Sequence, residues 1–265
     1  MKKYFAVSDV HSFYSDMMEA LNSKGYDKHN PEHIVVICGD AFDRGDESSK
    51  MFKWLKHQHK NNRLIYVRGN HEDLIIKLVE DIEKLRHIGT HHISNGTLKT
   101  ISDIMDCSKF DILNNCYNKK IFANYINDLI TFIDDVTVDY FELGKTVFVH
   151  GWVPTTSDNK GQIYVHENWR DGGWNDARWD NGMEMFHFDI LPPDKEMIVC
   201  GHWHTSFGWS NYEKKCSEWN EDAIFDPYIK YSKDCKHLIV AIDGCTAYTR
   251  QVNCVVFDEA GNILD

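Results

Sequence analysis

The chain has 265 residues, and its 29 lysine and arginine residues against 41 aspartate and glutamate residues give a formal net charge of −12. A hydrophobic content of 42% and a charged content of 26% exclude a collagen, a coiled coil and a wholly disordered chain. The acidic balance argues against binding to duplex nucleic acid, because phosphate backbones attract basic surfaces, but it permits a small phosphate ligand in a local pocket. The apolar runs are too short for a membrane span or a signal peptide, so we expect a cytoplasmic protein.

Short apolar runs rich in valine and isoleucine recur along the chain and predict buried strands. These runs are 4–7, 34–38, 64–67, 146–149, 197–200, 238–242 and 252–257. Segments with apolar residues at helical spacing lie between the early runs and predict helices at 15–21, 48–57 and 73–85. Such alternation of strands and helices is typical of an α/β fold.

The rest of the chain is interpreted as insertions into this pattern. Apolar spacing at 98–105 and 120–133 predicts a helical insertion near 97–134, and polar, tryptophan-rich sequence predicts loop insertions near 155–190 and 209–237. The pair His91-His92 lies in a polar stretch and is expected in an exposed loop. No linker or repeat divides the chain, so we expect a single domain over 1–265. The eight cysteines form no CxxC pair, which argues against a zinc ribbon and favours reduced thiols.

Residue types that bind metals follow almost every predicted strand. The five segments are Ser8-Asp9-Val10-His11, Gly39-Asp40-Ala41-Phe42-Asp43-Arg44-Gly45, Arg68-Gly69-Asn70-His71-Glu72, Val149-His150-Gly151 and Gly201-His202-Trp203-His204. Ligands of open α/β sheets bind at the carboxyl ends of the strands. We therefore expect these side chains to converge at one edge of the sheets.

Carboxylates together with neutral imidazoles suit divalent manganese, iron or zinc, whereas calcium prefers oxygen ligands alone. Two metal ions about 3.5–4 Å apart need a shared ligand, and Asp40 is the natural candidate for that bridge. Glycines stand beside these residues in several of the segments, which allows sharp turns and close approach of the backbone.

The ordered motifs DxH, GDxxDRG, GNHE, a lone histidine and GHxH resemble those of the calcineurin-like metallophosphoesterase superfamily. The resemblance runs from Asp9 to His204, and the DRG and NHE motifs are most similar to the phosphoprotein phosphatase branch of bacterial and phage type. It implies an α/β fold, an αββα sandwich of two mixed β-sheets flanked by helices. It also implies hydrolysis of phosphate esters by a hydroxide held between two divalent metal ions, with manganese expected before iron or zinc.

The resemblance assigns a role to each motif residue. Asp9, His11 and His204 would bind the first metal, Asn70, His150 and His202 the second, and Asp40 would bridge the two. Arg44 and, by a looser match, Arg178 would bind substrate phosphate. His71, oriented by Asp43, would be the general acid that protonates the leaving oxygen.

Three features depart from the phosphoprotein phosphatase pattern. Ser8 and Ser12 replace glycines, His204 is an additional ligand, and a SAPNY-type segment is absent. Two substrate classes therefore stay open. The first is a phosphoprotein, hydrolysed by a serine/threonine phosphatase. The alternative is a small ester or nucleotide, hydrolysed by a phosphodiesterase or dinucleoside polyphosphate hydrolase. A binding module without activity is the third reading.

Five of the tryptophans after the fourth predicted strand have two interpretations. They are Trp169, Trp174, Trp179, Trp203 and Trp209. Most are expected to pack the long loops against the core. The alternative is that one or two of them form a stacking surface for a nucleotide base.

Overall fold

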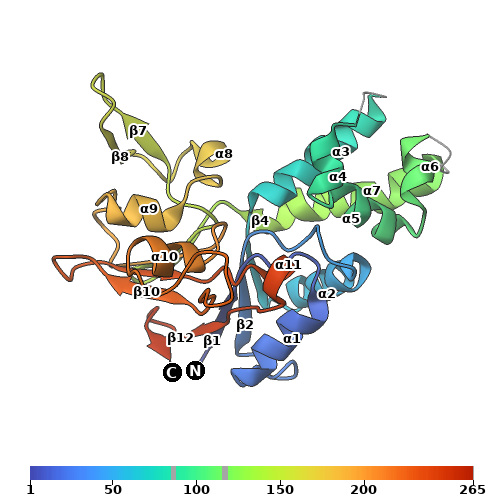
Figure 1. Ribbon diagram of the computed structural model, residues 1–265. Coiled ribbons are helices and arrows are strands. Elements are labelled where there is room, and N and C mark those ends of the chain that lie inside the picture. Colours follow the sequence, from blue (N-terminus) through green and yellow to red (C-terminus); the bar gives the residue numbers. More distant parts are fainter. Residues whose placement is uncertain (85–87, 115–118, 265) are drawn as a thin grey trace.

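The computed structural model describes residues 1–84, 88–114 and 119–264, and in this part of the chain two sheets pack against each other between layers of helices (Figure 1). The first sheet has six strands, in the order β13 (Ile263–Leu264), β12 (Val255–Phe257), β1 (Lys3–Val7), β2 (His33–Cys38), β3 (Leu64–Val67) and β4 (Thr137–Val138). Strands β1 to β4 are parallel, and β12 pairs antiparallel with β1.

The second sheet has five strands in the described residues, in the order β10 (Tyr228–Tyr231), β11 (Leu238–Ala241), β9 (Met197–Cys200), β6 (Thr146–Phe148) and β5 (Phe141–Leu143). The three central strands are parallel, and the two outer strands are antiparallel to their neighbours. A separate hairpin joins β7 (Thr155–Ser157) to β8 (Ile163–Val165). Both main sheets are therefore mixed, as the resemblance implies.

Helices cover the outer face of each sheet (Figure 1). The helical layer on the first sheet consists of α1 (Tyr14–Ser23), α2 (Ser48–Lys60), α3 (Asn70–Glu83), α4 (Thr90–Ser94), α5 (Thr97–Met105), α6 (Lys109–Leu113) and α7 (Lys119–Val136). The second sheet is covered by α8 (Trp174–Ala177), α9 (Gly182–His187) and α10 (Ser206–Asn211), and α11 (Thr246–Thr249) follows β11. The expected αββα arrangement is confirmed.

Alternating side chains of the strands explain why the predicted runs are apolar throughout. Phe5 and Val7 of β1 pack into the helical layer, whereas Tyr4 and Ala6 pack between the two sheets. A strand covered on both faces has no side for polar residues. The polar residues are consequently displaced to the strand ends, where they form the site described below.

The structure corrects several boundaries. The segment 155–190, expected as a loop, contains β7, β8, α8 and α9, and 209–237 contains the edge strand β10. The strand predicted over 252–257 begins at Val255, and the helix predicted from 73 begins at Asn70. Strand β10 escaped prediction because its sequence YIKY alternates between buried and exposed positions over only four residues. The end predicted for that helix, at 85, lies outside the described residues.

The described ranges contain no helix with both the length and the apolar character needed to cross a lipid bilayer. The seven cysteines within them are free thiols, as expected, and Cys116 lies outside these ranges.

The structure also corrects the expected position of the His91-His92 pair, which lies in α4 rather than in an exposed loop. The side chain of His92 is fully buried, and neither ring nitrogen has a hydrogen-bond partner among the described residues. Burial, followed by the charge of His91, lowers the pKa of His92 from 6.5 to about 4. The carboxylates of Asp81 and Asp43 oppose this shift, and Lys77 adds to it.

We expect this buried imidazole to make the free energy of unfolding depend on pH. The unfolded chain protonates His92 near pH 6.5 and the folded protein only near pH 4, so its contribution is present above pH 6.5 and is lost as the pH falls towards 4. Urea unfolding at several pH values should therefore give a flatter profile for His92→Leu than for the wild type. Exposed His29 provides the matched control, His29→Leu, and an equally steep profile for His92→Leu would contradict the prediction.

Candidate metal centre

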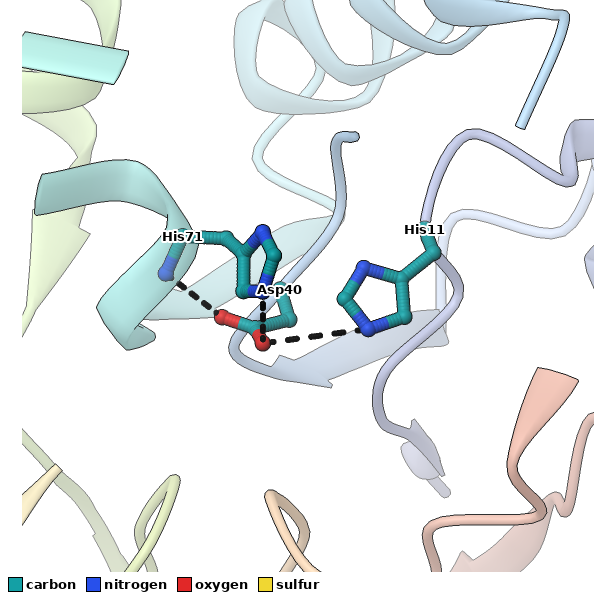
Figure 2. A group of neighbouring side chains, drawn as sticks. All are labelled: His11, Asp40 and His71. Carbon is teal, nitrogen blue, oxygen red and sulfur yellow. Dashed lines mark hydrogen bonds and ion pairs between the residues drawn. The ribbon is translucent and has the colours of Figure 1, made fainter. Parts of the chain in front are cut away.

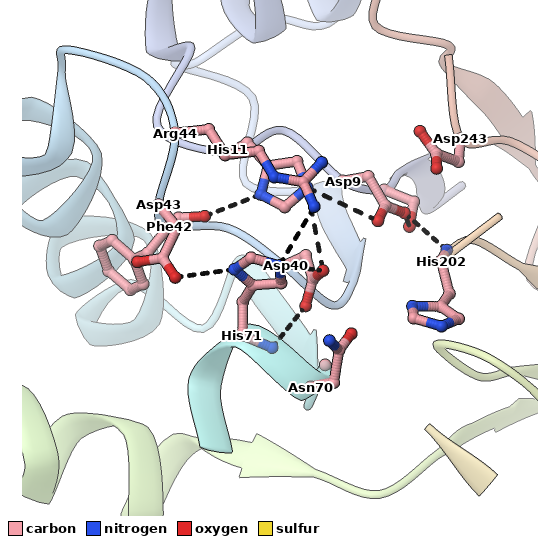
Figure 3. Close-up of polar contacts among 12 residues, drawn as sticks. Asp9, His11, Asp40, Phe42, Asp43, Arg44, Asn70, His71, His202 and Asp243 are labelled. Carbon is pink, nitrogen blue, oxygen red and sulfur yellow. Dashed lines mark hydrogen bonds and ion pairs between the residues drawn. The ribbon is translucent and has the colours of Figure 1, made fainter. Parts of the chain in front are cut away.

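The strand ends bring the predicted ligands to one place. Asp9 follows β1, Asp40 follows β2, and Asn70 begins α3 immediately after β3. His150 follows β6, and His202 follows β9 of the second sheet. Figure 3 shows Asp9, Asp40, Asn70 and His202 around a common centre, so the convergence expected from the sequence is present.

Asp40 lies between two groups of donor atoms. Its Oδ2 atom lies 3.9 Å from His11 Nε2 and 3.8 Å from His71 Nε2 (Figure 2). Its Oδ1 atom lies 3.4 Å from His150 Nε2. In each of two groups, His11 with Asp40 and His71, and Asp40 with His150 and His202, the donor atoms lie within 4.8 Å of one another. Asp40 is common to both groups, as a bridging ligand must be.

Two of the histidines are oriented as metal ligands usually are. The Nδ1 atom of His11 lies 2.9 Å from the carbonyl of Phe42, and that of His150 lies 2.8 Å from the carbonyl of Cys38. A carbonyl only accepts, so each Nδ1 donates, and the Nε2 atom of each ring is turned towards the centre. His150 Nε2 lies 2.8 Å from the Oδ1 atom of Asn70, so two of the ligands predicted for the second metal are in direct contact. Such a pair of donors fits a shared cation.

Burial and charge set the ionisation that a metal site requires. Burial lowers the pKa of His202 to about 3 and holds that of His11 well below 6.5, so both rings are neutral at pH 7. Burial would raise the pKa of Asp40, but the charges of His150 and His71 outweigh it and keep this carboxyl ionised. Neutral imidazoles around a carboxylate suit a divalent transition metal.

Two glycines are required by the close approach of the backbone to these ligands. A Cβ atom on Gly39 would lie 2.3 Å from Nδ1 of His150, and one on Gly69 would lie 2.2 Å from Oδ1 of Asp40. No side chain fits at these distances. The glycines of the GDxxDRG and GNHE motifs therefore make room for the ligands, as the sequence predicts.

Left-handed backbone conformation is concentrated at this centre. Positive φ angles occur at Asp9 (51°), His11 (46°), Asp40 (56°), Asp43 (75°), Arg44 (59°) and His202 (66°). Each such residue costs on the order of 1 kcal/mol or more and persists only where its surroundings fix it. These conformations lower the stability of the fold, and they direct the side chains of the motif residues towards the centre.

The predicted general acid has the expected partner. Oδ2 of Asp43 accepts a 2.7 Å hydrogen bond from His71 Nδ1 and a 2.8 Å bond from the Thr97 hydroxyl. The Thr100 hydroxyl donates to Oδ1 at 2.7 Å. Burial would lower the pKa of His71, but Asp40 and Asp43 outweigh it and raise the pKa to about 9. The two threonines, on α5, were not anticipated, because no short-range motif connects them to the site.

Arg44 and Asp9 complete the centre. An Nη2 atom of Arg44 lies 3.3 Å from His71 Nε2 (Figure 3), so a phosphate oxygen held by this guanidinium would lie within reach of the His71 ring. Oδ2 of Asp9 accepts hydrogen bonds from the Ser8 hydroxyl and from the His202 backbone amide, the latter at 2.9 Å. Its Oδ1 atom lies 3.9 Å from His11 Nε2, which is where a ligand of the first metal is expected.

The structure reveals a positioning residue that the sequence analysis left without a role. Glu72 is fully buried and accepts hydrogen bonds from the amides of Asp40 (3.0 Å), Ala41 (3.0 Å) and Gly69 (2.8 Å). It also accepts a 2.6 Å bond from the Tyr66 hydroxyl. Glu72 therefore fixes the backbone on which Asp40 is mounted. Its position three residues after the helix N-cap was the signal available in the sequence.

We expect Glu72→Gln to lower the free energy of unfolding by about 1–3 kcal/mol, because a side-chain amide turns a donor towards N–H groups that need an acceptor. Chemical denaturation measures this loss. Glu83→Gln, an exposed change on the same helix, is the matched control. Equal stability of the two variants would show that the Glu72 hydrogen bonds do not hold this loop.

Two predicted site residues have other partners. The guanidinium of Arg178 is buried and bonds to Asp73 at 2.9 Å and to Asp139, which leaves little of it for a phosphate. His204 places Nδ1 2.7 Å from the Ser206 hydroxyl and Nε2 3.5 Å from Glu218, and it belongs to neither group of donor atoms in the described residues. The structure thus brings together the other predicted residues but not these two.

A family profile described as calcineurin-like phosphoesterase matches residues 2–233. The chain belongs to this family. Phosphoesterases of this kind hydrolyse phosphoric esters, and the two donor groups that share Asp40 are the candidate sites for the metal pair on which the family depends.

Among curated proteins, this phosphoesterase is similar to two bis(5′-nucleosyl)-tetraphosphatases described as asymmetrical. The one from Halalkalibacterium halodurans is 31% identical over 71 residues, 24% of this chain and 29% of the relative. The one from Bacillus subtilis (strain 168) is 31% identical over 74 residues, 26% of this chain and 30% of the relative. The chain thus spans less than a third of the length of these relatives.

Two solved structures resemble this phosphoesterase over nearly its whole length. A putative diadenosine tetraphosphatase has a TM-score of 0.50 and 14% identity, covering 99% of this chain and 92% of its own. A cold-active protein-tyrosine phosphatase of Shewanella has a TM-score of 0.52 and 15% identity, covering 100% of this chain and 80% of its own. At these identities the likeness establishes the fold alone.

Proposed function

We propose that this phosphoesterase hydrolyses nucleoside polyphosphates, and dinucleoside polyphosphates in particular. The observation that carries the proposal is that two donor groups share Asp40, while His71 of the first group is held by Asp43 and lies next to Arg44. The named activity of the tetraphosphatases, similar to this chain over 71–74 residues, supports the nucleotide as substrate. The close packing between the sheets supports one catalytic domain.

Six side chains of the centre would bind the two cations. Asp9 and His11 would hold one divalent cation, Asn70, His150 and His202 the other, and Asp40 would contact both. The cations, with manganese as our first choice, would polarise the phosphoryl oxygens and acidify a water molecule when bound.

The other polar residues would act on the substrate itself. Arg44 would bind an oxygen of the phosphoryl group that is attacked, since a guanidinium matches phosphate geometry. His71 would deliver a proton from Nε2 to the leaving oxygen, while Asp43 holds the ring by Nδ1. Arg44 and His71 would thus meet the substrate on one side, because their nitrogen atoms lie 3.3 Å apart.

A serine/threonine protein phosphatase is the second candidate. Its support is the DRG and NHE sequence at Asp43 to Gly45 and Asn70 to Glu72, together with the hydrogen bond between Asp43 and His71. Both candidates use the same centre and differ only in what surrounds the phosphoryl group.

A parallel assay separates the two candidates. With manganese added, we expect diadenosine tetraphosphate to be hydrolysed with a kcat/KM at least about tenfold higher than that of a phosphoserine peptide or a model phosphodiester. A higher value for the phosphopeptide would favour the protein phosphatase. No hydrolysis of any of the three would overturn the proposed function.

A further inference from the structure

Four aromatic side chains next to the metal centre form a connected cluster, which we call the aromatic wall: His204, Trp219, Phe225 and Tyr248. The ring centroids of His204 and Trp219 lie 4.2 Å apart, and those of His204 and Phe225 lie 6.1 Å apart. Tyr248 closes the group, at 6.0 Å from Trp219 and 6.4 Å from Phe225. Each ring thus contacts two others.

The outer rings of the wall face solvent. The side chains of Trp219 and Tyr248 are 51% and 68% exposed, although both are large and aromatic. They line a surface hollow of about 790 Å³ together with Phe225, Asn220 and Glu221. A contiguous group of exposed aromatic side chains rimmed by polar residues is typical of a ligand-binding surface.

The wall is attached to the metal centre at two points. His204 is two residues from the predicted ligand His202. Tyr248 lies on α11, and the start of this helix is fixed to Asp243, whose carboxylate accepts a 2.7 Å hydrogen bond from the Cys245 amide. Asp243 lies near Asp9 and His202 at the centre (Figure 3). A substrate bound at the centre could therefore extend onto the wall.

His204 acts as the fixed support of the wall. Its Nδ1 atom lies 2.7 Å from the Ser206 hydroxyl, which in turn donates a 2.7 Å bond to the carbonyl of Glu218. The Glu218 carboxylate lies 3.5 Å from His204 Nε2. These contacts hold Trp219 in place through the residue before it. They also account for the position of His204 among aromatic residues rather than beside Asp40.

Resting on the proposed function, we propose that the aromatic wall binds the base of the nucleotide substrate and makes the enzyme selective for it. Indole and phenol rings stack on any base, and the Asn220 amide and Glu221 carboxylate can pair with the exocyclic amino group of adenine. The carboxylates of this segment repel free phosphates. The polyphosphate chain is consequently directed to Arg44 and the metal centre, with the base on the wall.

The proposal is tested by removing the ring. We expect Trp219→Ala to raise KM for diadenosine tetraphosphate about tenfold, with a much smaller effect on kcat. The loss of kcat/KM for inorganic tripolyphosphate, which has no base, should be at least about fivefold smaller. Trp219→Phe, which keeps a ring, should restore most of the affinity. Tyr231→Ala, which removes another exposed aromatic ring, on β10, is the matched control.

Adenosine binding separates this inference from the proposed function, because adenosine has no phosphate. Calorimetry should detect adenosine binding to the wild type and to Tyr231→Ala, and a loss of about tenfold in Trp219→Ala. If Trp219→Ala loses the same factor in kcat/KM for diadenosine tetraphosphate and for tripolyphosphate, the aromatic wall does not bind the base, although the proposed hydrolase activity stands. Binding of choline phosphate in place of adenosine would also overturn it, because a cation suits the same aromatic and acidic surface. If no substrate is hydrolysed, the proposed function is wrong, and the adenosine titration still shows whether the aromatic wall binds a base.

Discussion

Replacing Asp40 with asparagine is expected to lower kcat/KM at least about 10³-fold, which corresponds to about 4 kcal/mol of transition-state stabilisation. The reason is its position: one oxygen lies near His11 and His71, and the other near His150. A neutral amide removes the negative charge from both donor groups at once, so metal content should fall together with activity. Steady-state kinetics and elemental analysis of protein loaded with manganese measure the two effects.

Asp46→Asn is the matched control for this experiment. Asp46 lies in the same loop, but its side chain is exposed and its contact is a surface ion pair with Lys99 at 2.9 Å. We expect this variant to keep its metal content and its activity, since exposed ion pairs contribute little. If Asp40→Asn and Asp46→Asn lose the same amount of metal, Asp40 does not bridge the two donor groups.

The second large effect is expected for His71→Asn, which should lower kcat about 10²–10⁴-fold for substrates with a basic leaving oxygen. A general acid matters less when the leaving group needs no proton. The loss should therefore be much smaller for p-nitrophenyl phosphate than for an alkyl phosphate. Comparing kcat for these two substrates in the wild type and the variant measures the difference.

The same variant distinguishes two roles for His71. Its Nε2 atom lies 3.8 Å from Asp40, close enough to serve a metal, while Asp43 holds its other nitrogen at 2.7 Å. A proton donor predicts that His71→Asn keeps its metal and becomes sensitive to the leaving group. Loss of metal with equal effects on both substrates would identify His71 as a ligand instead.

The metal centre could be predicted from the sequence because its residues stand where strands end. Parallel strands place their carboxyl ends at one edge, so Asp9, Asp40 and Asn70 needed only the strand positions to be brought together. The second sheet adds His150 and His202 by the same rule. The motifs identified the ligand residues in chain order, and the apolar runs identified the strands that they follow.

The remaining features depend on contacts between distant parts of the chain. Thr97 and Thr100 reach Asp43 only because α5 folds over the loop after β2, across more than fifty residues. The Arg178 guanidinium similarly donates a hydrogen bond to Asp73, which is 105 residues away in the sequence. No local spacing encodes such pairs, since they follow from tertiary packing.

The contacts of His204 could not be predicted from its motif. The GHxH motif places it two residues after His202, and the resemblance to the metallophosphoesterases implies a ligand of the first metal. The contacts of Ser206 and Glu218 turn its ring towards Trp219 instead. Ser206 begins the short helix α10 and Glu218 lies in the irregular segment after it, and hydrophobic periodicity marks neither contact.

The most direct test of the account is anomalous diffraction from crystals grown with manganese. We predict two peaks, one beside Asp9 and His11 and one beside His150 and His202, with Asp40 in contact with both. A single peak that touches only one of these pairs, or metal bound away from Asp40, would contradict the shared carboxylate from which the proposed chemistry follows.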